Sequence, residues 1–162
     1  MLTFRSANEN DCGLILEFIK ALAAYEKLSD QVVATEALLR EWIFEKQKAE
    51  VIFACEDNKE IGYALFFHNF STFLGRAGIF LEDLFILPEY RGKGYGKEFL
   101  RKLAQMTEER GCGRLEWSCL DWNKPSIDFY RSLGAEPMDE WTIYRLTGES
   151  LTSLTSKCSE AL

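Results

Sequence analysis

The segment RGKGYG, residues 91–96, constrains the fold more than any other part of this sequence. Gly92, Gly94 and Gly96 leave it almost without side-chain packing, and a strong helical pattern follows directly. A run of strand-forming residues, 79–87, precedes it. The order strand, glycine-rich turn, helix brings backbone N–H groups close to a ligand at the positive end of a helix. The sequence therefore predicts an anion site.

Basic residues at the same segment strengthen this prediction. Arg91, Lys93 and Lys97 could add full positive charges, so we expect a phosphate or pyrophosphate ligand. The Walker pattern GxxxxGK(S/T) does not match, because Lys97 is followed by Glu98 rather than by Ser or Thr. The dinucleotide-binding pattern GxGxxG does not match either, because the spacing here is GxGxG. The alternative is a helix that merely begins at a flexible turn.

Hydrophobic periodicity and turn residues predict the remaining elements. The expected strands are residues 2–5, 51–55, 61–68, 79–87, 115–120 and 141–146. The expected helices are an apolar-striped one after Asn8–Asp11, one capped by Thr35, the long one to about Arg110, and a short one that opens at 123–125 and ends at Gly134. The order β-α-α-β-β-β-α-β-α-β predicts an α/β protein, a mixed sheet with helices on both faces.

Length and composition fit one domain over residues 1–162, in which 147–162 form a C-terminal tail or a short helix. The net charge of −7 argues against a nucleic-acid surface and suits a cationic partner, or only solubility. Five cysteines without CxxC spacing suggest reduced thiols and no zinc site. The first residues lack signal-peptide features and no apolar run approaches a membrane span, so we expect a cytoplasmic protein without membrane contact.

The motif RGKGYG resembles the R/Q-x-x-G-x-G/A signature of the GNAT superfamily of N-acetyltransferases, in its strand–loop–helix context. This resemblance covers residues 2–146 and implies the GNAT fold, with a mostly antiparallel, twisted sheet. It also implies that the loop binds the pyrophosphate of acetyl-coenzyme A (acetyl-CoA). The expected cofactor-binding residues are Leu84, Phe85, Ile86, Arg91, Gly92, Lys93, Gly94, Tyr95, Gly96, Lys97, Asn123, Lys124, Pro125 and Ser126.

Other segments resemble the diamine (spermidine/spermine) acetyltransferase subfamily. They are AAYEKL at 23–28, FLEDLFILPEYRGKGYG at 80–96 and DWNKPSIDFYRSLGA at 121–135. FSTFLGR at 70–76 lies where polyamine enzymes carry an Asp, and its Ser-Thr pair is similar to the thialysine N-ε-acetyltransferase branch. The resemblance implies a homodimer and a small amine substrate.

Transfer to an amine needs a proton acceptor and a donor for the leaving thiolate. Glu82 and Asp83 are adjacent carboxylates in an apolar strand, so they point to opposite faces unless a bulge intervenes. The resemblance implies that Glu82 is the substrate anchor, or a base acting through water, and that Asp83 is structural. It also implies that Tyr130 is the general acid, although a core aromatic is the alternative from periodicity alone.

The acceptor side is expected to include Tyr25 and Glu26, which the subfamily places over the amine pocket, together with Glu116, Trp117 and Ser118. Asp139 and Glu140 are candidates for a further acidic group. We expect no metal site. The sequence thus predicts an acetyl-CoA-dependent N-acetyltransferase for a small cationic amine such as thialysine, a lysine analogue, a diamine or a polyamine, by direct attack in a ternary complex. The alternatives are a protein or peptide N-acetyltransferase and a non-catalytic CoA-binding regulatory module.

Overall fold

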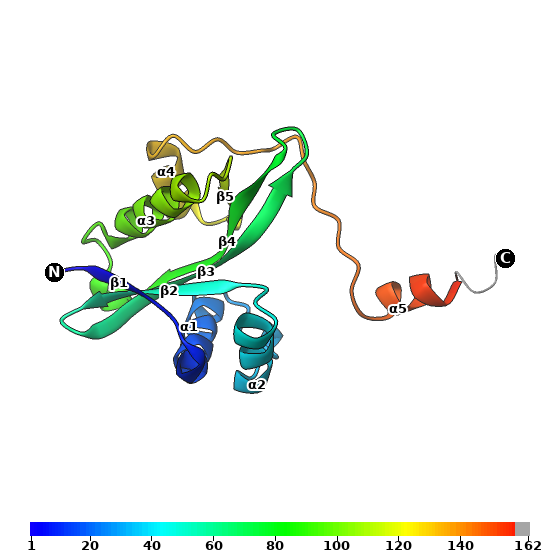
Figure 1. Ribbon diagram of the computed structural model, residues 1–162, viewed down its shortest axis with the longest axis horizontal. Helices are drawn as coiled ribbons and strands as arrows, with labels where there is room; N and C mark the ends of the chain where they lie inside the picture. The colour runs from blue at the N-terminus through cyan, green and yellow to red at the C-terminus, as the bar shows by residue number, and fades with distance from the viewer. Residues whose placement is uncertain (158–162) are drawn as a thin grey trace. The chain divides into compact units, whose positions relative to one another are not determined.

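The computed structural model describes residues 1–157 (Figure 1). These residues divide into two compact units, Met1–Ser118 and the described part of Cys119–Leu162. The expectation of a single domain over the whole chain stays a prediction.

One sheet organises the first unit. Its strands are β1 (Thr3–Ser6), β2 (Glu50–Glu56), β3 (Lys59–Ser71), β4 (Arg76–Ile86) and β5 (Leu115–Trp117). The strand order is β1-β2-β3-β4-β5, with three antiparallel pairings and a parallel one between β4 and β5. The predicted mixed, mostly antiparallel sheet is confirmed, and β2 and β3, which contain the expected strands 51–55 and 61–68, form an antiparallel pair.

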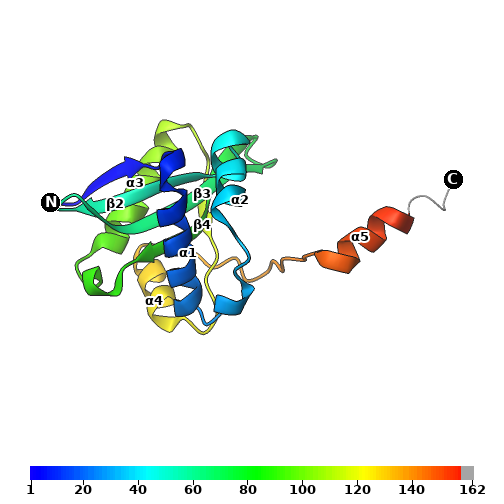
Figure 2. The ribbon, with the colours of Figure 1, turned by 90° about the horizontal axis from the view of Figure 1, so that it is seen from below.

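Helices cover both faces of this sheet. They are α1 (Cys12–Tyr25), α2 (Glu36–Leu39) with its π-helical continuation η3 (Arg40–Glu45), and α3 (Tyr95–Glu109). Short 3-10 turns lie at Glu9–Asp11, Ser29–Gln31 and Pro88–Tyr90. Figure 1 shows α1 and α2 on one face and α3 on the other, and Figure 2 shows α1 crossing in front of the strands. The predicted two-faced arrangement is confirmed.

Local chemistry explains where these helices begin and end. Asn8 forms a capping box with Asp11 ahead of α1, and the Thr35 hydroxyl accepts from the Leu38 N–H at the start of α2. Gly111 follows α3 with φ of 66°, the left-handed conformation that ends many helices. All three are positions at which the sequence predicts a cap or a stop.

Alternation along the strands sends aromatic side chains to both faces. On the α1 face, Phe18 packs against Phe53, Tyr63 and Phe85. On the α3 face, Phe99 meets the Phe4 ring edge-on, with centroids 5.1 Å apart. Complete burial of one such side chain stabilises the fold by about 1.5–3 kcal/mol. The two aromatic layers therefore hold α1 and α3 firmly against the sheet.

The second unit contains α4 (Lys124–Ser132) and α5 (Gly148–Lys157). Asn123 caps α4, and Gly134 follows its end with φ of 86°, as predicted. The C-terminal segment is helical over α5, in keeping with the short helix expected there, and residues 158–162 lie outside the described part.

The strand predicted at 141–146 is wrong. This segment has no regular structure, and Trp141 and Tyr144 are 76% and 92% exposed. β-forming residues make a strand only when a neighbouring strand pairs with them. The five strands of the described sheet do not include such a partner for this segment.

Candidate active site

The glycine loop leads directly into α3. Gly94 is the residue at the helix N-terminus, with φ of 82°, and Gly92 has φ of 78°. A Cβ atom on either glycine would meet no atom within 4 Å, so backbone conformation, not crowding, requires glycine here. No side chain caps α3. The first N–H groups of the helix thus have no side-chain cap, and an anion could accept from them.

Glu56, at the end of β2, anchors this loop. Lys93 Nζ lies 3.4 Å from a Glu56 carboxylate oxygen, and the Tyr95 hydroxyl donates to the other oxygen. That hydrogen bond, and then the Lys93 charge, lowers the pKa of the Glu56 carboxyl. No sequence pattern points to Glu56, because it is 37 and 39 residues away from its two partners.

Arg91, in the glycine loop, contacts both β4 and the end of α1. Its Nε donates to the Ile86 carbonyl at 2.9 Å, and its guanidinium lies 4.9 Å from the Tyr25 ring centroid and 5.1 Å from that of Phe85. Such cation–π contacts contribute about 0.5–1 kcal/mol at exposed sites. The structure thereby brings together the loop, the strand expected to meet pantetheine, and the end of α1 expected to meet the amine.

A β-bulge in β4 changes the geometry of the two adjacent carboxylates. Leu65 pairs with Asp83 and Phe66 with Leu81, so Glu82 is the extra residue of the bulge. Glu82 is exposed, whereas Asp83 is partly buried and accepts a hydrogen bond from the Tyr63 hydroxyl at 2.5 Å. The bulge lifts the requirement that the two side chains point to opposite faces.

The Glu26 carboxyl is influenced by the two carboxylates at the bulge. Burial, and then the negative charges of Asp83 and Glu82, raise the pKa of the Glu26 carboxyl. Glu26 is the residue that follows α1, next to Tyr25. The negative charges of both Glu82 and Asp83 thus act on the predicted residue Glu26.

The three predicted acceptor-side residues in and directly after β5 have different surroundings. Leu81 pairs with Trp117, which places Trp117 beside the bulge. Glu116 is held farther along the strand, where it accepts from Asn69 Nδ2 at 3.1 Å and lies 3.9 Å from Arg114 Nε. Ser118 follows the strand and is exposed. The Glu116 carboxylate is thus engaged with side chains of the protein itself.

The other predicted residues belong to the second unit. Asn123 is buried and accepts from the Ser126 N–H at 3.4 Å, while Lys124 pairs with Asp128 at 2.5 Å within the same helix. Pro125 occupies the first turn. Tyr130 is partly buried, and its ring lies 5.5 Å from that of Phe129. Asp139 and Glu140 are exposed.

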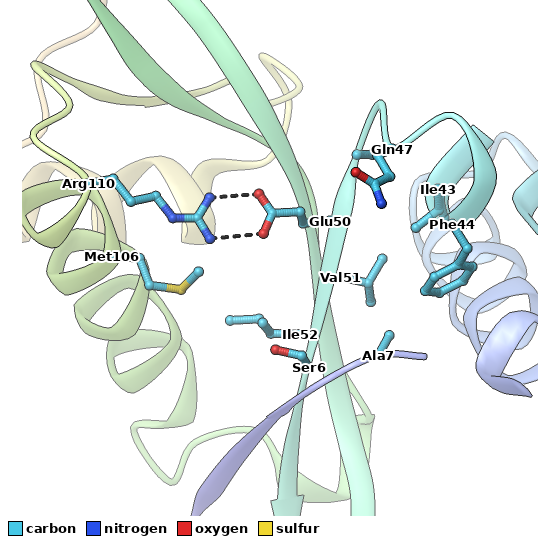
Figure 3. Close-up of a pocket in the computed structure, with 11 residues that line it drawn as sticks. Ser6, Ala7, Ile43, Phe44, Gln47, Glu50, Val51, Ile52, Met106 and Arg110 are labelled. Atoms are coloured by element: carbon cyan, nitrogen blue, oxygen red, sulfur yellow. Dashed lines mark hydrogen bonds and ion pairs between the residues drawn. The ribbon is translucent and has the colours of Figure 1, made fainter. Parts of the chain in front are cut away.

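A hollow of about 380 Å³ lies at the Glu50 end of β2, opposite the end that carries Glu56 (Figure 3). Arg110 and Glu50 form a two-pronged ion pair on one side of β2, and Ile43 and Phe44 of η3 lie on the other side. Glu50 and the loop anchor Glu56 stand at the two ends of β2, so they are about 20 Å apart. This hollow contains none of the predicted site residues and is remote from the glycine loop.

Neither a metal site nor a membrane span is found in the part of the chain that the structure describes. No group of three or more His, Cys, Asp or Glu residues there is arranged to hold a metal ion. None of the helices described is long and apolar enough to cross a membrane. The four described cysteines are free thiols, and Cys158 lies outside the described residues.

The model of the acetyltransferase (GNAT) family matches residues 16–135, which include the bulged strand, the glycine loop and α4. The chain belongs to this family. The predicted family membership and GNAT fold are confirmed, and the protein is an acetyltransferase.

Similar proteins support the assignment of this chain to the acetyltransferase (GNAT) family. It is 40% identical to the thialysine N-ε-acetyltransferase of Bos taurus over 94% of the chain and 96% of the relative. It is 42% identical to the L-ornithine N5-acetyltransferase NATA1 of Arabidopsis thaliana, over 57% of the chain and 41% of that protein. An integron cassette protein from the V. cholerae mobile metagenome has a similar structure, with a TM-score of 0.79, 28% identity, and coverage of 95% and 97%.

Proposed function

We propose that this enzyme transfers an acetyl group from acetyl-CoA to the primary amine of a small cationic metabolite, by direct attack in a ternary complex. The observation that carries the proposal is the group of carboxylates at the bulge. The two charges that act most on Glu26, those of Asp83 and Glu82, are both negative. A site that concentrates negative charge favours a cation, and an alkylammonium group has a pKa of about 10.4.

The glycine loop supports acetyl-CoA as the donor. The uncapped N-terminus of α3, the open space at Gly92 and Gly94, and the ammonium of Lys93 suit a pyrophosphate. Gly96 and Lys97, in the first turn of α3, belong to the same proposed subsite, and Leu84, Phe85 and Ile86 would meet the pantetheine arm. When bound, acetyl-CoA supplies the acetyl group as an activated thioester.

The side chains have distinct proposed tasks. The carboxylates of Glu26 and Glu82 attract and orient the ammonium, and a carboxylate with a raised pKa is a better acceptor for the proton that the amine must lose. Tyr25 and Trp117 would form walls beside these carboxylates. Tyr130 would donate the proton that the leaving thiolate needs, a modest demand because a free thiol has a pKa of about 8.5. Asn123, Lys124, Pro125 and Ser126 are proposed cofactor contacts of α4.

Thialysine, ornithine and related lysine-like amines are the acceptors we favour, because relatives with those substrates in their names are 31–42% identical to this chain. Transfer to a protein or peptide amine is the second candidate. We also expect a homodimer in the cytoplasm that does not bind nucleic acid.

A panel of amines tests the proposal. Thiol release from acetyl-CoA is followed with thialysine, lysine, ornithine, spermidine and a lysine-containing peptide at equal concentrations. A small lysine-like amine should accelerate release most. If the peptide alone accelerates release, the second candidate replaces the first, and if no amine does, the proposed function is wrong.

A further inference from the structure

Tyr63 and Asp83 form a polar pair inside an otherwise apolar layer. The Tyr63 side chain is fully buried, and its ring stacks on Phe18 of α1 with centroids 5.3 Å apart. Its hydroxyl donates to Asp83 Oδ2 at 2.5 Å. A buried tyrosine hydroxyl normally needs a partner, but a carboxylate is an unfavourable choice, because burial of its charge costs free energy. This cost suggests a task for the pair.

The pair lies on the face of the sheet that α1 covers. Tyr63 pairs with Phe85 across the β3–β4 ladder, and Phe85 packs against Phe18 of α1. Asp83 is two residues before Phe85 and therefore points to the same face. Glu26 follows the last turn of α1, the helix that covers this face, and the negative charge of Asp83 acts on its carboxyl.

One oxygen of Asp83 remains available. The hydrogen bond from Tyr63 engages Oδ2. No buried side-chain oxygen in the described residues lacks a partner. Oδ1, for which the described structure contains no hydrogen bond, is therefore accessible to solvent or to a ligand.

We propose that Tyr63 is a positioning residue of the acceptor site: its hydroxyl fixes Asp83 through Oδ2, so that the Asp83 carboxylate stays ionised beside Glu26 and holds the ammonium of the acceptor. The inference rests on the proposed function and extends it to a buried tyrosine that does not touch the substrate. It also replaces the structural role that the sequence suggested for Asp83.

The electrostatics of the pair agree with this role. Burial raises the pKa of the Asp83 carboxyl, and the hydrogen bond from Tyr63 acts in the opposite direction. Burial and the nearby carboxylates raise the pKa of Tyr63, so it remains a protonated donor. The groups that surround the pair are Glu26 from α1, Glu82 from β4, and Arg91, whose guanidinium lies over Phe85.

Tyr63→Phe removes the hydroxyl and retains the ring. Without its donor, Asp83 should take up a proton at higher pH than in the wild type. Between the two pKa values the wild type carries the charge and the variant does not. The KM for the amine should therefore rise in the variant as the pH is lowered, by about 10-fold or more, with little change in the KM for acetyl-CoA.

The experiment compares the pH profiles of kcat/KM for thialysine in the wild type, Tyr63→Phe and Phe18→Leu. The acidic limb should move to higher pH in Tyr63→Phe only, since Phe18→Leu disturbs the same packing and leaves the hydrogen bond. Asp83→Asn should raise the amine KM similarly, and Tyr63→Phe should add little to it. An unmoved limb, or an equal rise of both KM values, would overturn the inference.

A second readout separates this inference from the proposed function. The Asp83 carboxyl carbon can be followed by NMR in ¹³C-aspartate-labelled protein without any substrate. Its titration midpoint should be higher in Tyr63→Phe than in the wild type, and an unchanged midpoint contradicts the inference. If the wild type acetylates no small amine while the midpoint shifts, the acceptor assignment fails and the Tyr63–Asp83 coupling stands.

Discussion

At the scale of single residues, the proposed mechanism divides proton transfer between carboxylates and a phenol. Glu26 and Asp83 are carboxylates whose pKa is raised, chiefly by burial. Such groups accept protons more readily than exposed carboxylates do. The proposed proton donor, Tyr130, is a phenol, and the ordinary pKa of a tyrosine is about 10. A base and an acid of these strengths fit a reaction that deprotonates an ammonium and protonates a thiolate.

Tyr130→Phe tests the donor. Loss of the phenolic proton should lower kcat by about 10²- to 10⁴-fold, the usual contribution of a general acid. Binding of CoA, measured by calorimetry, should stay within about 2-fold of the wild type, because a single hydroxyl contributes little binding energy to so large a ligand. Tyr144→Phe, on an exposed tyrosine, is the control. A variant with full turnover would remove Tyr130 from the mechanism.

At the scale of elements, α3 connects cofactor binding to backbone conformation. Gly94 and Gly111 lie at its two ends, both at positive φ and both with open space where a Cβ atom would lie. They offer a matched pair of substitutions, since the strain of a Cβ atom is similar at each. Only Gly94 belongs to the proposed pyrophosphate site.

Gly94→Ala and Gly111→Ala should each destabilise the protein by about 1 kcal/mol in urea unfolding. Gly94→Ala should also weaken CoA binding by about 10-fold or more, as the strained turn moves N–H groups away from the pyrophosphate. Gly111→Ala should leave the Kd for CoA unchanged. Equal Kd values for the two variants would mean that the loop is not the pyrophosphate site.

Local sequence patterns predict elements better than they predict partners. The turn between β2 and β3 can be predicted because Asp57 and Asn58 tolerate positive φ, and they adopt φ of 50° and 62°. The extension of the β3–β4 hairpin to Ser71 and Arg76 is not predicted, since its length depends on pairing. For the same reason 141–146 has the pattern of a strand and does not form one.

The site follows the same rule. The glycine loop is a local pattern in the sequence, and so is the pair of adjacent carboxylates Glu82 and Asp83. A single sequence therefore suffices to find both of them. Three other features of the site join strands or loops that are far apart in the sequence: the bulge at Glu82, the hydrogen bond between Tyr63 and Asp83, and the Glu56 anchor. The hydrogen bond joins residues 20 apart, and Glu56 is 37 and 39 residues from its two partners. Contacts of this kind depend on register, which a single sequence does not reveal.

At the scale of the whole molecule, stability should depend on pH through ion pairs remote from the site. Arg5 donates to both oxygens of Asp11, at 2.9 Å each, and this pair lowers the pKa of the Asp11 carboxyl below its usual value. The unfolded chain therefore binds the Asp11 proton more tightly than the folded protein. The stabilisation is present above the ordinary pKa and is lost as the pH falls through the lowered value.

Asp11→Asn should lower the free energy of unfolding by about 1 kcal/mol at neutral pH, a discounted value because Arg5 is partly exposed. Its unfolding free energy should also fall less steeply than that of the wild type below about pH 4. Glu26 and Asp83 act in the opposite sense, since their raised pKa values favour the folded state in acid. Urea unfolding over this range decides the point, and parallel curves for the two proteins would contradict it.

The central claim is that the enzyme acetylates a small lysine-like amine. The most direct measurement is mass spectrometry of thialysine after incubation with acetyl-CoA and the purified protein, with CoA release measured in the same sample. We expect thialysine that carries one acetyl group on its side-chain amine, in amounts equal to the CoA released. CoA release without an acetylated amine, or acetyl found only on added peptide, would contradict it.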